Sequence, residues 1–228
     1  ECLGGLVYVN AIEPGAPAIL GTWPFVSDLR TGSMCGGSPE QGLISAACAQ
    51  MGNYFDLPTG APAGMTDAKF PDFQAGSERA LTHVVTAIAG ANIIYESAGM
   101  HASLLGCCLE SYVIDNDMLG AINRTVRGIE VNAETLSLDP IRDVCLDGPG
   151  HYLGHEQTLN RMQSDYLYPI VGDRENINNW IEQGSTDSIQ RAHLKLKEIL
   201  KTHFPNNWDE DTDSKIREQF PIRLPRNR

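Results

Sequence analysis

The side chains that could do chemistry in this chain are aromatic rings and carboxylates near the ends of its apolar runs. The rings belong to Tyr8, Trp23, Tyr54 and Tyr95, and the carboxylates to Glu13, Asp28, Asp67 and Glu96. A quaternary ammonium ion cannot form hydrogen bonds through its nitrogen, so cation–π and Coulomb attraction have to bind it. Core packing and helix capping explain any one of these residues more simply, so the hypothesis requires at least two of them to act together.

Two further patterns carry weaker chemical signals. His151 and His155 have the i, i+4 spacing of helical metal ligands, but Gly150 and Gly154 disfavour a helix and no third ligand is evident, so we expect no metal site. Lys69 precedes every other lysine by more than a hundred positions and could form a Schiff base. An exposed lysine at a helix entry is the simpler interpretation.

Cys35 and the glycines after it also favour structural roles. A thiol before a helix start can have a lowered pKa, but no partner base for Cys35 is apparent. Gly36-Gly37-Ser38 resembles a phosphate-binding turn only weakly, because an acidic chain without nearby Lys or Arg suits phosphate poorly.

An α/β framework has to position these side chains. The Gly/Pro-rich loop 59–71 lies between a short apolar segment and a helix-like segment, and a strand-like run follows at once. Strand, loop, helix and strand form the repeating unit of parallel α/β proteins, which carry their chemistry on loops at the carboxyl ends of strands. We therefore expect a site on this loop.

The elements amount to half of an eight-stranded barrel. Strands are expected at 6–12, within 18–25, from residue 57 and at 92–95, and helices at 38–52, 71–90, 105–126, 133–144 and 189–199. Ser38 predicts the cap of the first of these helices, with Pro39 at its first position and Gln41 completing a capping box. Its predicted buried face is Leu43, Ile44, Ala47, Cys48 and Met51, and Gly52 is expected to end it.

Composition excludes several classes of protein. The 228 residues are 42% hydrophobic and 20% charged, as in a folded globular protein, and the net charge of −12 argues against nucleic acid. We expect no membrane span and no signal peptide, and the six cysteines lack a CxxC pair, which favours a reducing cytoplasm. The chain opens at Glu1 without an initiator Met, so we expect a piece of a longer protein.

Four ordered blocks resemble the trimethylamine methyltransferase family. They read GAPAGMTDAKFPDFQAGSERAL, AIAGANIIYESAGM, VIDNDMLGAINRTVRGIEVNAETL and GHYLGHEQTL, and the likeness runs from about residue 4 to 200. The resemblance implies the C-terminal half of a (β/α)8 TIM barrel at residues 1–145, followed by a mainly helical C-terminal extension at 146–228. It also implies methyl transfer from a methylated amine to the Co(I) corrinoid (cobalamin) of a small partner protein, with no cofactor bound tightly to this chain.

One departure from the family narrows the expected substrate. Founding members carry pyrrolysine, and the resemblance places that position near Gly64, Met65 and Thr66, where this chain has standard residues. Members without pyrrolysine are similar to enzymes that act on quaternary amines such as glycine betaine. No catalytic residue is assigned.

The substrate-binding residues are predicted from their places in the sequence. We expect Trp23 and Tyr95 as walls, Asp67 and Glu96 as electrostatic contacts, and two holders of a substrate carboxylate. Those holders are Arg30 and His101.

Two rival hypotheses remain open. One is a non-catalytic protein that binds quaternary amines or regulates through them on the same scaffold, and the other is an aldolase-like barrel that uses Lys69. Because half a barrel exposes two unpaired sheet edges, we expect it to belong to a longer chain or to form a homo-oligomer.

Overall fold

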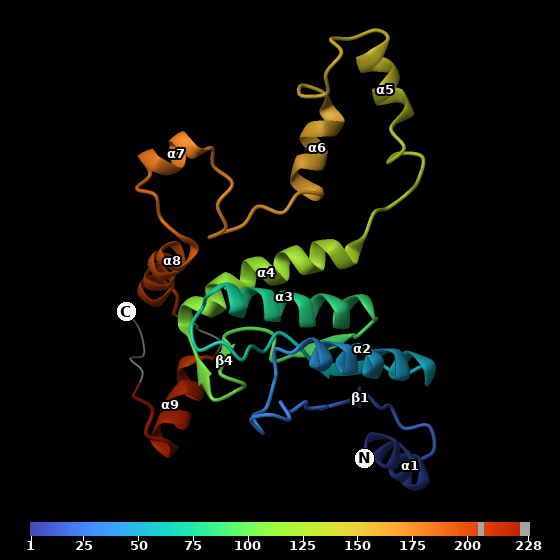
Figure 1. The fold of residues 1–228 in the computed structure, drawn as a ribbon, viewed down its shortest axis with the longest axis vertical. Coiled ribbons are helices and arrows are strands. Elements are labelled where there is room, and N and C mark those ends of the chain that lie inside the picture. The colour runs from blue at the N-terminus through green and yellow to red at the C-terminus, as the bar shows by residue number, and fades with distance from the viewer. Residues whose placement is uncertain (205–207, 224–228) are drawn as a thin grey trace.

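The computed structural model describes residues 1–204 and 208–223 and shows a mixed helix and sheet fold (Figure 1). The helices are α1 (Cys2–Ile12), α2 (Pro39–Tyr54), α3 (Phe73–Ile88), α4 (Leu109–Arg127), α5 (Leu138–Cys145), α6 (Glu156–Ser164), α7 (Ile177–Glu182), α8 (Ser188–Thr202) and α9 (Glu210–Gln219). The strands are β1 (Leu20–Gly21), β2 (Thr59–Pro62), β3 (Ile93–Tyr95), β4 (Met100–His101) and β5 (Gly106–Cys107).

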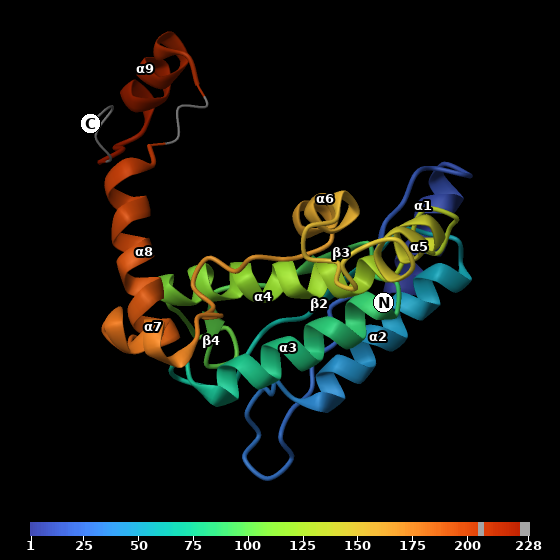
Figure 2. The ribbon, with the colours of Figure 1, turned by 90° about the horizontal axis from the view of Figure 1, so that it is seen from above.

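A short parallel sheet organises the first half of the chain. Its strand order is β1-β2-β3, with Gly21 beside Gly60 and Pro62 beside Tyr95 in register. Helices α2 and α3 connect these strands and lie alongside each other (Figure 2). The predicted strand, loop, helix and strand unit is therefore confirmed. Within the described residues the outer strands β1 and β3 have no further partner.

Helix α2 packs through its small residues, contrary to the predicted apolar face. Ala49 and Gly52 are buried, whereas Leu43 and Met51 are exposed. A Cβ on Gly52 would overlap the side chain of Thr59 on β2, so this glycine permits close packing of helix on strand. The prediction that Gly52 ends the helix was wrong, because α2 continues to Tyr54.

The start of α2 confirms half of the predicted capping box. The Ser38 hydroxyl accepts the backbone N–H of Gln41 at 3.2 Å. The Gln41 Oε1 does not accept the Ser38 N–H, which donates to the Cys35 carbonyl at 3.3 Å. The Gln41 Nε2 donates to the Pro24 carbonyl at 2.8 Å and to Ser45 Oγ at 3.2 Å. The side chain ties the helix to the segment after β1 instead.

The predicted first strand at 6–12 was wrong, because those residues lie in helix α1. An apolar run of this length does not distinguish a strand from a helix, and α1 has no buried residue to give it a helical stripe. Val7, Tyr8 and Ile12 are all about two-thirds exposed, at 70%, 68% and 68%.

The segment between β3 and α4 also differs from the prediction. The helix expected from residue 105 begins at Leu109, and the hairpin β4–β5 precedes it. The buried Arg79 of α3 supports this hairpin, since its guanidinium donates to both carboxylate oxygens of Asp115 on α4, at 2.6 and 2.9 Å, and to the Met100 carbonyl. The backbone N–H of Gly99 donates to Asp115 at 2.7 Å.

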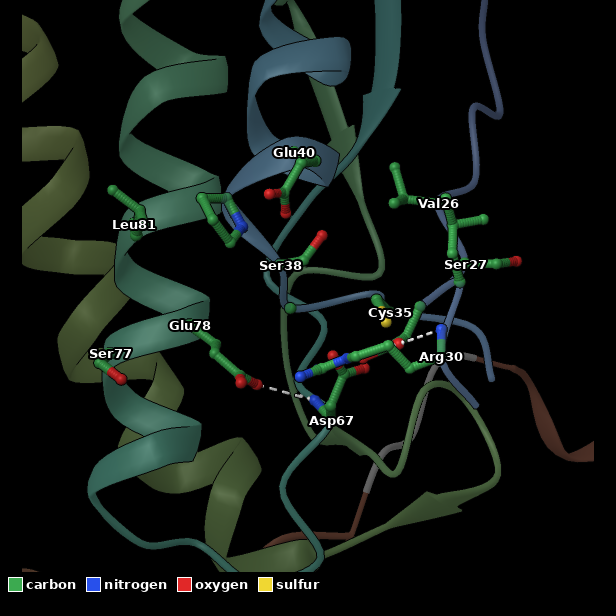
Figure 3. A pocket seen from close by; sticks show the side chains of 14 residues that line it. Val26, Ser27, Arg30, Cys35, Ser38, Glu40, Asp67, Ser77, Glu78 and Leu81 are labelled. Atoms are coloured by element: carbon green, nitrogen blue, oxygen red, sulfur yellow. Dashed lines mark hydrogen bonds and ion pairs between the residues drawn. The ribbon is translucent and has the colours of Figure 1, made fainter. Parts of the chain in front are cut away.

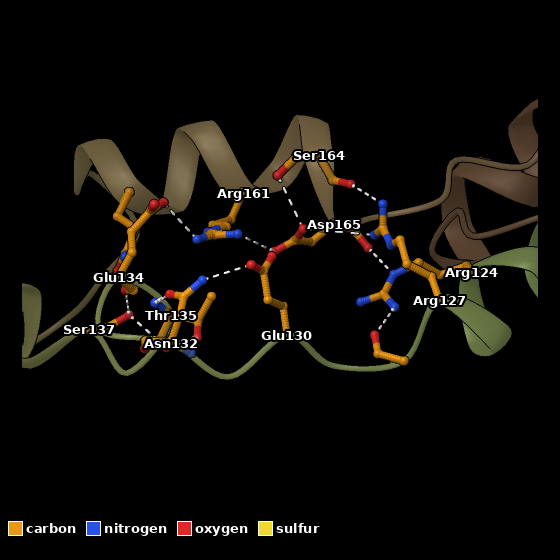
Figure 4. A network of polar contacts seen from close by, with 12 residues as sticks. Arg124, Arg127, Glu130, Asn132, Glu134, Thr135, Ser137, Arg161, Ser164 and Asp165 are labelled. Carbon is orange, nitrogen blue, oxygen red and sulfur yellow. Dashed lines mark hydrogen bonds and ion pairs between the residues drawn. The ribbon is translucent and has the colours of Figure 1, made fainter.

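The second half of the chain is helical and joins the first half through α4. Helix α8 packs on α4 around Val113, Val171 and Ala192. Figure 4 shows the polar network near the other end of α4, where Arg124 Nε donates to the Asp165 carbonyl at 2.6 Å and Arg161 pairs with the Asp165 carboxylate. The domain boundary after residue 145 stays a prediction.

Two predictions for the C-terminal region can be compared only in part. The helix expected at 133–144 begins later, as α5. The sequence after residue 205 is acidic and then rich in Pro and Arg, which favours an extended arm or disorder, but it contains helix α9. The last residues of that arm, 224–228, lie outside the described residues. No helix within 1–204 and 208–223 combines the length and apolarity of a bilayer span.

Candidate functional site

An aromatic pair lies at the carboxyl ends of β1 and β3. Trp23 follows β1 by two residues and Tyr95 is the last residue of β3. Their rings stack with centroids 4.7 Å apart and planes inclined at 23°. The Tyr95 hydroxyl donates to the Thr22 carbonyl, and burial raises the pKa of this phenol. The two rings predicted as walls are therefore brought together, although 73 positions separate Thr22 from Tyr95.

The aromatic pair occupies the face of the sheet opposite α2. Thr59 of β2 points toward α2, where it meets Gly52, so the next residue, Gly60, points to the other face. A Cβ on Gly60 would lie 2.9 Å from Tyr95 Cε1, which places the Tyr95 ring over Gly60. The absence of a side chain at residue 60 lets the ring lie across β2.

A third ring, which the sequence reasoning missed, extends this surface. Phe25 lies 5.7 Å from Trp23 between ring centroids, and the two side chains are 51% and 47% exposed. The spacing of Trp23 and Phe25, two residues apart in an extended segment, was the available signal. Together Trp23, Phe25 and Tyr95 form what we call the aromatic surface.

The predicted carboxylates differ in their surroundings. Glu96 directly follows β3 with a left-handed backbone (φ 63°), and its side chain has no hydrogen bond or ion pair within the part of the chain described here. Asp67 follows β2 and accepts a hydrogen bond from the Ser103 hydroxyl, which also lies 2.7 Å from the Met34 carbonyl. Glu96 is therefore available to a cation, whereas Asp67 is already held in place.

Asp67 also lines a cavity of about 700 Å³ between the loop after β1, the start of α2 and the middle of α3 (Figure 3). Arg30, Glu40 and Glu78 line it as well, and Trp23, Tyr95 and Glu96 do not. Five of the six predicted residues thus fall into two groups, Trp23 and Tyr95 with the adjoining Glu96, and Asp67 with Arg30 at this cavity. His101 lies in neither group.

The two proposed holders of a substrate carboxylate have partners already. Arg30 is 88% exposed, and its Nη2 lies 2.6 Å from Asp28, which lowers the pKa of that carboxyl well below its usual range. His101 is 4% exposed, with its ring nitrogens 3.2 Å from the Ala68 carbonyl and 2.7 Å from Ser111 Oγ. Burial, followed by the charge of Arg79, lowers the pKa of His101.

Comparison with known proteins decides the family. The family model of trimethylamine methyltransferase (MTTB) matches residues 1–224. The chain is 37% identical over 212 residues to a trimethylamine methyltransferase MttB of Methanosarcina thermophila, covering 92% of this chain and 43% of that protein. The chain belongs to the trimethylamine methyltransferase family. The predicted resemblance is confirmed.

Relatives within the family act on different amines, as their names state. A trimethylamine methyltransferase MttB of Desulfitobacterium hafniense is 34% identical over 217 residues, covering 95% of this chain and 43% of the relative. A glycine betaine methyltransferase of Desulfitobacterium hafniense is 29% identical over 217 residues, covering 95% of this chain and 44% of the relative. The chain spans less than half the length of the relatives it matches.

The stretch that the resemblance aligned with pyrrolysine is enclosed in this family member. Gly64, Met65 and Thr66 are all buried. The Gly64 N–H donates to Thr82 Oγ1 at 3.2 Å, and Thr66 Oγ1 donates to Glu78 Oε2 at 2.6 Å. These contacts fix the backbone after β2.

The remaining candidates from the sequence lie apart from the aromatic surface. Tyr54 is 79% exposed at the end of α2, and the Lys69 ammonium donates to the Asp67 carbonyl. Burial raises the pKa of Cys35, opposite to the shift that would activate a thiol. His155 caps α6 by accepting the N–H of Gln157. Residues 1–204 and 208–223 hold no cluster of three His, Cys, Asp or Glu side chains suited to a metal ion.

Proposed function

We propose that this chain is part of a methyltransferase that moves a methyl group from a quaternary amine, such as glycine betaine, to the Co(I) corrinoid of a small partner protein. Membership of the family supports the methyl transfer, and the names of relatives support methylated amines as substrates. The observation that carries the proposal is the stacked pair Trp23 and Tyr95 on the face of the sheet opposite α2.

In this proposal the parallel sheet is the C-terminal half of a (β/α)8 barrel. The order β1-β2-β3 with α2 and α3 as connections is the expected repeat of such a barrel. The face that carries the aromatic surface becomes the interior, and the open edges of β1 and β3 meet strands of a longer chain or of a second copy. Six unpaired cysteines support the cytoplasm as the compartment.

The aromatic surface binds the ammonium end of the substrate. A positive nitrogen over the Trp23 and Tyr95 rings gains cation–π attraction of about 0.5–1 kcal/mol when exposed and about 2 kcal/mol when desolvated. Glu96 and Asp67 add negative potential at the same edge of the sheet. Arg30 remains the proposed partner of a substrate carboxylate, because its exposed guanidinium can release Asp28 and bind that carboxylate instead. The buried His101 does not contact the substrate in this proposal.

The chemistry asks little beyond this positioning. The Co(I) electron pair forms the new bond to the methyl carbon, while the electrons of the C–N bond stay on nitrogen and a neutral tertiary amine leaves. No proton has to be supplied to this leaving group, so alignment of the methyl group and exclusion of water provide the catalysis.

The test is whether the full-length protein methylates Co(I) cobalamin with glycine betaine or with trimethylamine as the methyl donor. The absorbance of methylcobalamin measures the product. We expect turnover with the quaternary amine and its loss in a Trp23→Leu variant. A Tyr54→Leu variant, which removes a ring outside the aromatic surface, should retain full activity. Tight betaine binding without methylation of any corrinoid acceptor would instead favour the non-catalytic binding protein.

A further inference from the structure

Glu78, on α3, contacts the loop after β2 and the loop after β1 at the carboxyl edge of the sheet. Its Oε2 accepts the hydroxyl of Thr66 at 2.6 Å and the backbone N–H of Asp67 at 2.8 Å. Its Oε1 accepts the Gln74 amide at 2.7 Å, which orients the carboxylate from within α3. Figure 3 shows the contact between Glu78 and Asp67, both of which line the cavity. Hydrogen bonds to a charged acceptor are stronger than those between neutral groups.

The same carboxylate touches the loop that follows β1. A Cβ on Gly37, just before α2, would lie on Glu78 Oε2 and 2.9 Å from Glu78 Cβ. Gly37 is buried, so its backbone packs directly against the Glu78 side chain. One carboxylate thereby sets the distance between the loops after β1 and β2.

We propose that Glu78 is a positioning residue of the substrate site: it fixes the Thr66–Asp67 backbone against Gly37 and so sets where the Asp67 carboxylate lies. The Asp67 carboxylate in turn accepts a hydrogen bond from the Ser103 hydroxyl. Glu78 therefore also fixes the turn of the β4–β5 hairpin relative to the sheet. The role in substrate binding rests on the proposed function, whereas the role in fixing Asp67 does not.

Three left-handed residues make such fixation necessary. Ala102, Ser103 and Leu104 have φ values of 48°, 52° and 73°, a conformation that costs free energy for residues other than glycine. The Ala102 and Ser103 N–H groups donate to carbonyls of the loop after β2, at 3.0 Å each. The strained turn therefore takes its position from the loop that Glu78 holds.

The first experiment is amide hydrogen exchange at Asp67 in the full-length protein. A Glu78→Ala variant removes the acceptor of this N–H, so exchange should accelerate at least about tenfold more than at amides inside α4, which report global opening. A Glu78→Gln variant keeps an acceptor oxygen and should restore much of the protection. The matched control is Glu40→Ala, because Glu40 lines the same cavity but its side chain makes no hydrogen bond in the described part of the chain.

A second variant moves Glu78 without changing its chemistry. Gly37→Ala places a methyl group where the carboxylate now lies and should reproduce the faster exchange at Asp67. Gly76→Ala on α3 is its control, because a Cβ there meets nothing within 4 Å. Unchanged exchange at Asp67 in both Glu78→Ala and Gly37→Ala, or equal acceleration in either control, overturns the proposal.

Titration with glycine betaine separates this inference from the proposed function. We expect Glu78→Ala and Gly37→Ala to weaken binding about tenfold, with Glu78→Gln and Gly76→Ala close to the unsubstituted protein. If the unsubstituted protein binds no methylated amine, the proposed function fails, and the exchange rates still decide whether Glu78 fixes Asp67. Normal betaine affinity in variants with fast exchange at Asp67 overturns the role in substrate binding.

Discussion

Substituting Gly60 with alanine tests whether the aromatic surface is held as the structure shows. The new Cβ would lie 2.9 Å from Tyr95 Cε1, well inside contact distance, so the ring has to move. Displacement loses the Tyr95–Thr22 hydrogen bond, about 1 kcal/mol, and the Trp23 stack, about 0.5–1.5 kcal/mol. The expected cost is about 1.5–2.5 kcal/mol, a fall in melting temperature of about 3–10 °C for a domain of this size.

Gly21→Ala is the matched control for this substitution. Gly21 pairs with Gly60 in the sheet, and a Cβ at Gly21 meets nothing within 4 Å. Replacing glycine with alanine lowers the conformational entropy of the unfolded chain equally in both variants. The difference between their melting temperatures therefore isolates the clash with Tyr95. Thermal unfolding followed by circular dichroism and Trp fluorescence measures it. Melting temperatures that agree within about 1 °C would refute the placement of Tyr95 over Gly60.

Two other substitutions test the buried polar groups. Asp115→Ala leaves Arg79 buried without its partner and should cost about 3–5 kcal/mol in urea unfolding, whereas Asp211→Ala, which removes an exposed ion pair, should cost under about 1 kcal/mol. Burial lowers the pKa of His83 from its ordinary value of 6.5, so at mildly acidic pH the His83 ring is protonated more readily in the unfolded chain than in the folded chain. The free energy of unfolding should therefore fall as the pH drops below 6.5. Between pH 7.5 and 5.5, His83→Leu should reduce that fall by up to about 1 kcal/mol. An identical pH dependence of the unfolding free energy in the two proteins would contradict the lowered pKa.

The sequence predicted the elements whose ends are marked by punctuating residues. Ser38 and Pro39 marked the start of α2, and Asn92–Tyr95 was bounded by Gly90, whose φ is +97°. The buried faces of α2 and α3 could not be predicted from apolar spacing, because small and polar residues such as Thr82 make the close contacts. Gly42 packs directly on Thr82, a contact that depends on how closely the two helices approach.

The proximity of Trp23 and Tyr95 was predictable from the sequence, whereas the grouping of the other candidate residues was not. Trp23 and Tyr95 were placed together because the carboxyl ends of parallel strands meet at one edge. The division between the aromatic surface and the cavity beside Asp67 depends on side-chain direction after the strands end, where the alternation of a strand no longer applies. Phe25 was missed although its spacing of two residues from Trp23 was a usable signal.

Exposure of the aromatic surface has a consequence for affinity. Trp23 and Phe25 are about half exposed, so a cation on them stays hydrated and gains about 0.5–1 kcal/mol, enough for only a few-fold preference. Covering the opposite side of the ligand would raise this gain to about 2 kcal/mol or more by removing water. The curated relatives are more than twice as long as the matched region, which leaves room for such a cover. The proposed function therefore requires a second wall from outside β1–β3, and this wall has to lie on the sheet face opposite α2, which carries the aromatic surface.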